Sequence, residues 1–165
     1  MNNYKDFIRK KELIIEPSGF EVKHLNNNLM PYQKAIVKWA LKKGKSALFE
    51  DTGIGKTIQQ LAWSEAITRE LNGDVLILAP LAVSKQTIME GEKFGIKVNL
   101  CETNEDVKKG INITNYEKLH KFNTNSFLGV VLDESSILKS YTGKTTMELI
   151  EIFKSTNNKS LSKCQ

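Results

Sequence analysis

The chain has 165 residues, of which 40% are hydrophobic and 26% charged, so length and composition predict one globular domain with a buried core. Its longest apolar stretch, residues 75–83, contains a proline and is far shorter than the about 20 residues of a membrane-spanning helix. The first residues are charged and lack the apolar segment of a signal peptide, which predicts a cytoplasmic protein without a membrane partner. The net charge of +5 is concentrated in residues 1–45, and a basic surface favours a nucleic-acid partner.

Residues 1–28 are interpreted as an N-terminal hairpin and a linker. Residues 13–16 and 20–23 are strand-like, and the turn-forming residues 17–19 separate them. A helix is predicted over 31–43, because proline suits its first turn, apolar residues recur at helical spacing and a glycine follows its end.

Strand and helix patterns alternate from residue 46 onward. Apolar strands that alternate with helices predict an α/β domain, with a mainly parallel sheet covered on both faces. The predicted strands are residues 47–50, 75–79, 97–101, 111–114 and 130–132. The predicted helices are residues 57–71, 83–94 and 144–154, with shorter helical turns at 105–109 and 116–121. Residues 155–165 are polar, and no element is assigned to them.

A glycine-rich loop joins the first strand of this series to its first helix. Gly53 and Gly55 allow backbone N–H groups to turn around a phosphate, and the helix N-terminus adds partial positive charge. Lys56 has the position to reach the outer phosphates of a nucleotide, and the Thr57 hydroxyl to bind Mg²⁺. The general phosphate-loop pattern begins with glycine, whereas Glu50 occupies that position here. The predicted nucleotide-contacting residues of the loop are Thr52, Gly53, Ile54, Gly55, Lys56 and Thr57.

Two adjacent acids, Asp133 and Glu134, follow the apolar strand at 130–132. Unpaired carboxylates avoid burial, so their position at a strand end indicates a task there. We expect Asp133 to hold the Mg²⁺ of the nucleotide and Glu134 to orient and deprotonate the attacking water. The alternative is that both acids are solvated residues that open a loop.

Taken together, these motifs resemble superfamily 2 helicases and translocases, and among them the Swi/Snf-type and phage DEAD-like group. The similarity covers residues 29–154 and implies a RecA-like, helicase ATP-binding domain. Residues 51–59 resemble the first motif of the family, in which an acidic residue before the loop is common. Residues 29–33 resemble the upstream motif whose glutamine contacts adenine, which implies that Gln33 reads the base.

Further segments resemble family motifs that lie along the nucleic-acid track. They follow the second and fourth strands, at residues 78–83 and 113–117. Residues 133–136 resemble the DExx motif, although Ser136 stands where the family often has histidine or aspartate. The resemblance implies nucleic-acid contacts by Ser84, Gln86, Thr114 and Asn115.

The family's second motor domain, with the arginines that stabilise the transition state, is not found in this sequence. Residues 160–162 arrive where the third motif is expected, shortly before the sequence ends. We therefore expect a second RecA-like domain on a separate chain, or one lost by truncation in the tail of residues 155–165.

The resulting hypothesis is a first motor domain that binds Mg-ATP and contacts DNA, with RNA as a possible track. A non-hydrolysing nucleotide-binding regulator, or a truncated inactive remnant, is the alternative. A small-molecule kinase is a further possibility, although such enzymes carry an arginine-bearing lid that this sequence lacks. Stimulation of ATP turnover by nucleic acid discriminates between these classes.

Overall fold

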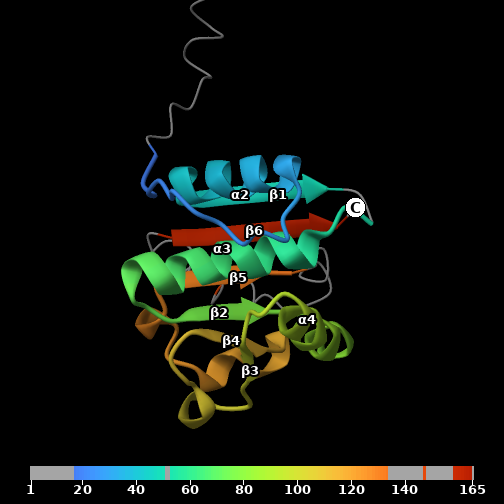
Figure 1. Ribbon diagram of the computed structural model, residues 1–165. Coiled ribbons are helices and arrows are strands. Elements are labelled where there is room, and N and C mark those ends of the chain that lie inside the picture. Colours follow the sequence, from blue (N-terminus) through green and yellow to red (C-terminus); the bar gives the residue numbers. More distant parts are fainter. Residues whose placement is uncertain (1–16, 51–52, 134–146, 148–157, 165) are drawn as a thin grey trace, which may run out of the picture.

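The computed structural model describes residues 17–50, 53–133, 147 and 158–164. Within these residues the chain forms a six-stranded sheet with the order β1-β6-β5-β2-β4-β3, in which every neighbouring pair is parallel (Figure 1). The strands are β1 (Lys45–Glu50), β2 (Val75–Leu78), β3 (Val98–Leu100), β4 (Ile111–Thr114), β5 (Gly129–Leu132) and β6 (Asn158–Cys164). All carboxyl ends therefore meet at one edge of the sheet.

Among the described residues, three complete α-helices connect or flank these strands, and short 3₁₀ helices follow β3 and β4. The α-helices are α2 (Pro31–Lys43), α3 (Lys56–Leu71) and α4 (Leu81–Lys93). The 3₁₀ helices are η1 (Asn104–Asp106), η2 (Tyr116–Lys121) and η3 (Thr124–Ser126). In Figure 1, α3 runs along one face of the sheet in front of β5 and β6, and α2 lies beside β1. Among the described residues, no helix is long and apolar enough to cross a membrane.

Strand β2 is buried on both faces of the sheet, and its successive side chains point to opposite sides. In β2, Val75 and Ile77 belong to the apolar cluster beneath the α-helices. Leu76 and Leu78 belong to a second cluster on the opposite face, which includes Tyr116 of η2. This arrangement confirms the predicted α/β class with a parallel sheet.

The predicted second strand of the N-terminal hairpin is wrong. Residues 20–23 form no strand; instead, the backbone N–H groups of Ser18, Gly19 and Phe20 donate to the carbonyls of Lys43, Lys42 and Leu41 at 3.0–3.3 Å. The last carbonyls of a helix have no partner within it, and this segment supplies donors to the end of α2. The predicted strand at 13–16 lies outside the described residues.

The sequence analysis assigns no element to the polar tail of residues 155–165, whereas residues 158–164 form the strand β6. This strand is paired along Lys45–Glu50 of β1 on one side and along Gly129–Leu132 of β5 on the other. The sheet therefore extends to Cys164. A strand hydrogen-bonded on both sides gains its backbone partners from tertiary structure, which the polar sequence does not reveal. The predicted helix at 144–154 lies outside the described residues.

Candidate nucleotide site

The predicted phosphate loop lies between the end of β1 and the start of α3. Gly53 and Gly55 have positive φ angles of 85° and 76°, a conformation that disfavours side chains other than glycine's. Gly55 is also the N-cap of α3, so the loop leads directly into a helix N-terminus. This is the local geometry that binds anions. Asp51 and Thr52 lie outside the described residues.

The carbonyl oxygen of Ile54 anchors the loop to two helices. It accepts hydrogen bonds from the Tyr32 hydroxyl at 3.0 Å, from Gln33 Nε2 at 3.0 Å and from Gln59 Nε2 at 3.4 Å. Gln33 is buried, and its Oε1 accepts from the backbone N–H of Met30 at 2.9 Å, at the start of α2. The structure thus brings Gln33 to the loop, where it braces the backbone. Its contact with adenine stays a prediction.

Glu50, the departure from the general loop pattern, is integrated into the site. Its carbonyl accepts from Lys56 Nζ at 3.0 Å, and its Oε2 accepts from Gln59 Nε2 at 3.2 Å. Lys56 and Thr57 are the first two residues of α3, so both lie at the helix end that faces the loop. The sequence analysis missed Gln59 and Tyr32. Tyr32 belongs to residues 29–33 and Gln59 to residues 51–59, and membership of these two motif-like segments was the available signal.

Asp133 lies at the same edge of the sheet, directly after β5. Its side chain is buried, with 7% of the residue exposed, and its Oδ1 accepts from Gln60 Nε2 of α3 at 2.9 Å. Its backbone N–H donates to Leu78 O at 2.8 Å, and its carbonyl accepts from the Tyr116 hydroxyl. Helix α3 thus contacts the phosphate loop at its first turn and Asp133 one turn later. Glu134 lies outside the described residues.

The donor set fits a magnesium ion that arrives with a nucleotide. Mg²⁺ is usually held by one or two carboxylates, substrate phosphates and water. Asp133 is a buried carboxylate. Three further buried oxygens, which flank or follow the predicted phosphate loop, have no hydrogen-bond partner among the described residues: Glu50 Oε1, Gln59 Oε1 and Gln60 Oε1. In the same part of the chain, no group of three or more His, Cys, Asp or Glu side chains is arranged to hold a metal alone.

The four predicted nucleic-acid residues differ in exposure. Ser84 is 1% exposed and its hydroxyl donates to Pro80 O at 3.2 Å, and Thr114 is equally buried. Gln86 is exposed on α4, where its amide donates to Glu90 at 3.3 Å. The structure therefore leaves Gln86 at the surface and holds Ser84 and Thr114 in the interior. A nucleic-acid contact by any of the four stays a prediction.

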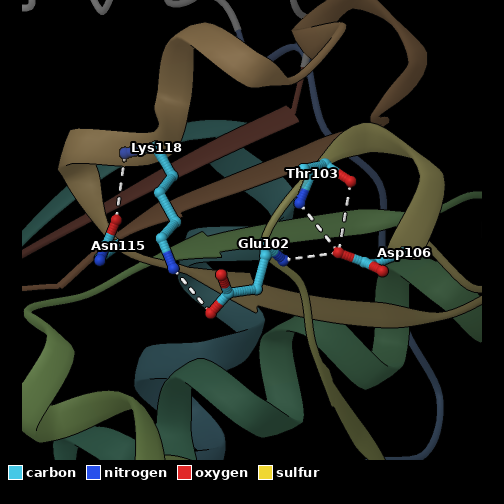
Figure 2. Close-up of polar contacts among 5 residues, drawn as sticks. All are labelled: Glu102, Thr103, Asp106, Asn115 and Lys118. Atoms are coloured by element: carbon cyan, nitrogen blue, oxygen red, sulfur yellow. Dashed lines mark hydrogen bonds and ion pairs between the residues drawn. The ribbon is translucent and has the colours of Figure 1, made fainter.

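Asn115, the fourth of these residues, caps η2. Its Oδ1 accepts from the Lys118 backbone N–H at 3.0 Å, and Lys118 Nζ lies 2.7 Å from Glu102 Oε1 in the loop after β3 (Figure 2). Asp106 Oδ2 accepts from the backbone N–H groups of Glu102 and Thr103, both at 2.9 Å. These two hydrogen bonds lower the pKa of the Asp106 carboxyl, because they stabilise its charged form. The Asn115 loop is thus tied to its neighbour.

Similar sequences are helicase-related proteins of much greater length. The chain is 30% identical over 128 residues to the SWI/SNF-related matrix-associated actin-dependent regulator of chromatin subfamily A-like protein 1 of Xenopus tropicalis, a match that covers 70% of this chain. It is 28% identical over 144 residues, 76% of this chain, to the mouse DNA annealing helicase and endonuclease ZRANB3. Both matches span 13% of the relative's length. No family model matches the chain.

Similar solved structures show the same fold. The UvsW helicase from bacteriophage T4 matches with a TM-score of 0.67 and 18% identity, over 97% of this chain and 60% of that one. A SWI2/SNF2 ATPase core from Sulfolobus solfataricus, solved in complex with dsDNA, matches with a TM-score of 0.64 and 22% identity, over 88% and 33%. The parallel sheet, its strand order and these neighbours define a RecA-like domain. Within that class, the sequence relatives place the chain with the Swi/Snf-type helicase domains of superfamily 2.

Proposed function

We propose that this chain is the ATP-binding first motor domain of a nucleic-acid-dependent ATPase of the helicase or translocase type. The observation that carries the proposal is the position of α3. One helix begins in a loop with two left-handed glycines, presents Lys56 there, and one turn later contacts the buried carboxylate of Asp133. Phosphate-binding and metal-binding groups are thus aligned along one edge of a parallel sheet, where ligands of such folds bind.

In this proposal each residue has a distinct chemical role. The loop N–H groups from Gly53 to Lys56 cradle the phosphates, and the Lys56 ammonium neutralises their outer charge. Thr57 and Asp133 hold Mg²⁺, which supplies charge neutralisation at the phosphates when bound. Glu134 orients the attacking water and accepts its proton.

A nucleotide titration tests the site directly. We expect a fluorescent ADP analogue with Mg²⁺ to bind the wild-type chain saturably, and Lys56→Ala to weaken binding at least tenfold, about 1.4 kcal/mol. Lys97→Ala is the matched control, because Lys97 is an exposed lysine just before β3, away from the edge that holds the loop. If both substitutions weakened binding equally, the loss would reflect only the reduced positive charge of the protein, and this result would contradict a specific phosphate site at Lys56.

Contact with DNA is the second part of the proposal. It is supported by the Sulfolobus relative's complex with dsDNA and by the basic charge of residues 1–45. The chain spans 13% of its curated relatives' length, so a second RecA-like domain is proposed as its partner in hydrolysis. We expect this chain alone to turn over ATP weakly or not at all, and turnover to rise when DNA is added together with a second RecA-like domain. Nucleotide binding without turnover, with DNA or RNA and that domain present, would favour the non-hydrolysing regulator instead.

A further inference from the structure

Gln60 is a buried amide in the middle of the proposed site. It lies on α3 one turn after Lys56, and 5% of the residue is exposed. Its Nε2 donates to Asp133 Oδ1 at 2.9 Å, and both groups are in the interior. A contact between buried polar side chains 73 residues apart is specific, because each group loses its water and keeps only the partner that the fold supplies.

The carbonyl oxygen of the same amide receives no hydrogen bond from the described residues. Gln60 Oε1 is buried and has no hydrogen-bond partner among the described residues. Leaving a buried acceptor unpaired is unfavourable, and such atoms are uncommon in folded proteins. The orientation of the amide is set by its bond to the carboxylate, so Oε1 is available to a donor that arrives later. Water molecules held by Mg²⁺ are strong donors of this kind, and protein-bound Mg²⁺ usually keeps several of them.

We propose that Gln60 is a positioning residue for the magnesium site. Its Nε2 holds the Asp133 carboxylate in place, and its Oε1 accepts a hydrogen bond from a water of the Mg²⁺ that accompanies the nucleotide. This inference rests on the proposed function and deepens it. Residues that orient a metal-binding carboxylate in this way commonly change metal affinity by about 10- to 100-fold when they are removed.

The test measures how strongly Mg²⁺ improves nucleotide binding. The Kd of a fluorescent ADP analogue is determined with excess Mg²⁺ and with EDTA. The readout is the ratio of the Kd in EDTA to the Kd in Mg²⁺, which is large when Mg²⁺ strengthens binding. In the wild-type chain we expect Mg²⁺ to improve nucleotide binding. Gln60→Met keeps the side-chain volume and removes both polar atoms, and it is expected to lower that ratio at least tenfold.

Ser64→Ala is the matched control. Ser64 is fully buried one turn further along α3, and its hydroxyl donates to Gln60 O at 2.8 Å. The substitution therefore removes a buried polar group from α3 and leaves the hydrogen bond between Gln60 and Asp133 in place. The ratio is expected to stay within twofold of the wild-type value. An equal loss of binding with and without Mg²⁺ in Gln60→Met would overturn the inference, since it would reflect only a structural role.

Gln60→Glu provides a second, independent result if the methionine variant folds poorly. It keeps an oxygen at this position but replaces the Nε2 donor with a second carboxylate oxygen beside Asp133, so the hydrogen bond that holds Asp133 is lost and the ratio is expected to fall below that of the wild-type chain. An unchanged ratio would overturn the inference while leaving the nucleotide site intact. Failure of the wild-type chain to bind nucleotide at all would instead overturn the proposed function.

Discussion

Gly55 is held in a left-handed conformation in a crowded place. A Cβ at this position would lie 2.6 Å from Gln33 Nε2, the atom that braces Ile54. Gly95 has nearly the same φ, 72° against 76°, but a Cβ there would meet nothing within 4 Å. Comparing alanine substitutions at Gly55 and Gly95 therefore separates the effect of backbone strain from the effect of displacing Gln33.

We expect Gly55→Ala and Gly95→Ala each to lower the free energy of unfolding by about 1–2 kcal/mol, the cost of a left-handed non-glycine residue. Only Gly55→Ala should also weaken nucleotide binding, because it displaces Gln33 from the loop carbonyl. Chemical denaturation and the ADP titration measure the two effects. Unaltered nucleotide affinity in Gly55→Ala would show that the brace by Gln33 does not shape the loop.

Asp106 gives the fold an acid-sensitive contact. Hydrogen bonds from two backbone N–H groups lower the pKa of its carboxyl in the folded state, so the charged form stabilises the fold above the ordinary aspartate pKa. That stability is lost as the pH falls through the folded-state pKa. The urea midpoint of the wild-type chain should therefore drop more steeply below about pH 4 than that of Asp106→Asn. Parallel pH profiles of the two proteins would contradict this assignment.

At the scale of elements, α4 and the turn that leads into β3 approach each other closely at Gly91. The Gly91 carbonyl accepts from the Ile96 backbone N–H at 2.8 Å, and a Cβ on Gly91 would lie 2.6 Å from the Ile96 carbonyl oxygen. Helix propensity alone favours alanine over glycine by about 1 kcal/mol. The close backbone contact opposes that gain, because the obstructing atom belongs to the main chain rather than to a flexible side chain.

We expect Gly91→Ala to lower the free energy of unfolding by about 1–3 kcal/mol, as overpacking does. Glu92→Ala, at the exposed neighbouring position on α4, should change it by less than about 0.5 kcal/mol. Denaturant unfolding monitored by circular dichroism measures both. A stabilised Gly91→Ala variant would mean that the turn after α4 relaxes freely.

The helices were predictable because their signals are local. The predicted helix at 57–71 begins one residue later than α3 and ends at the same residue. The strand predicted at 20–23 failed because Phe20 and its neighbours satisfy the carbonyl end of α2 instead of a second strand. Capping by a segment more than twenty residues away leaves no local pattern to detect.

For the whole molecule, β6 connects two parts of the sheet. It lies between β1, which leads into the phosphate loop, and β5, which leads into Asp133. β1 and β5 are not neighbours in the sheet, and each of them is hydrogen-bonded to β6. The candidate nucleotide site consequently lies at the ends of strands that are joined by β6, a segment to which the sequence analysis assigned no element.

Deleting residues 158–165 is expected to abolish cooperative unfolding and nucleotide binding, because β1 loses its strand neighbour and β5 loses one of two. A chain that lacks only Gln165, the residue after β6, is the control and should behave as the full chain does. Thermal unfolding and the ADP titration report the outcome. An unchanged unfolding transition in the longer deletion would show that β1 and α2 are held without β6.

The sequence alone determined the α/β class, most helix bounds, the glycine-rich loop and the acid that follows a buried strand. These features depend on residue type and on the spacing of residues close together in the chain, and both can be read from the sequence. Only the tertiary structure decided that Gln60 holds Asp133, that three donors converge on the Ile54 carbonyl and that a polar segment completes the sheet. Those contacts join residues distant in sequence, and burial selects them because a desolvated polar group keeps only the partner that the fold brings to it.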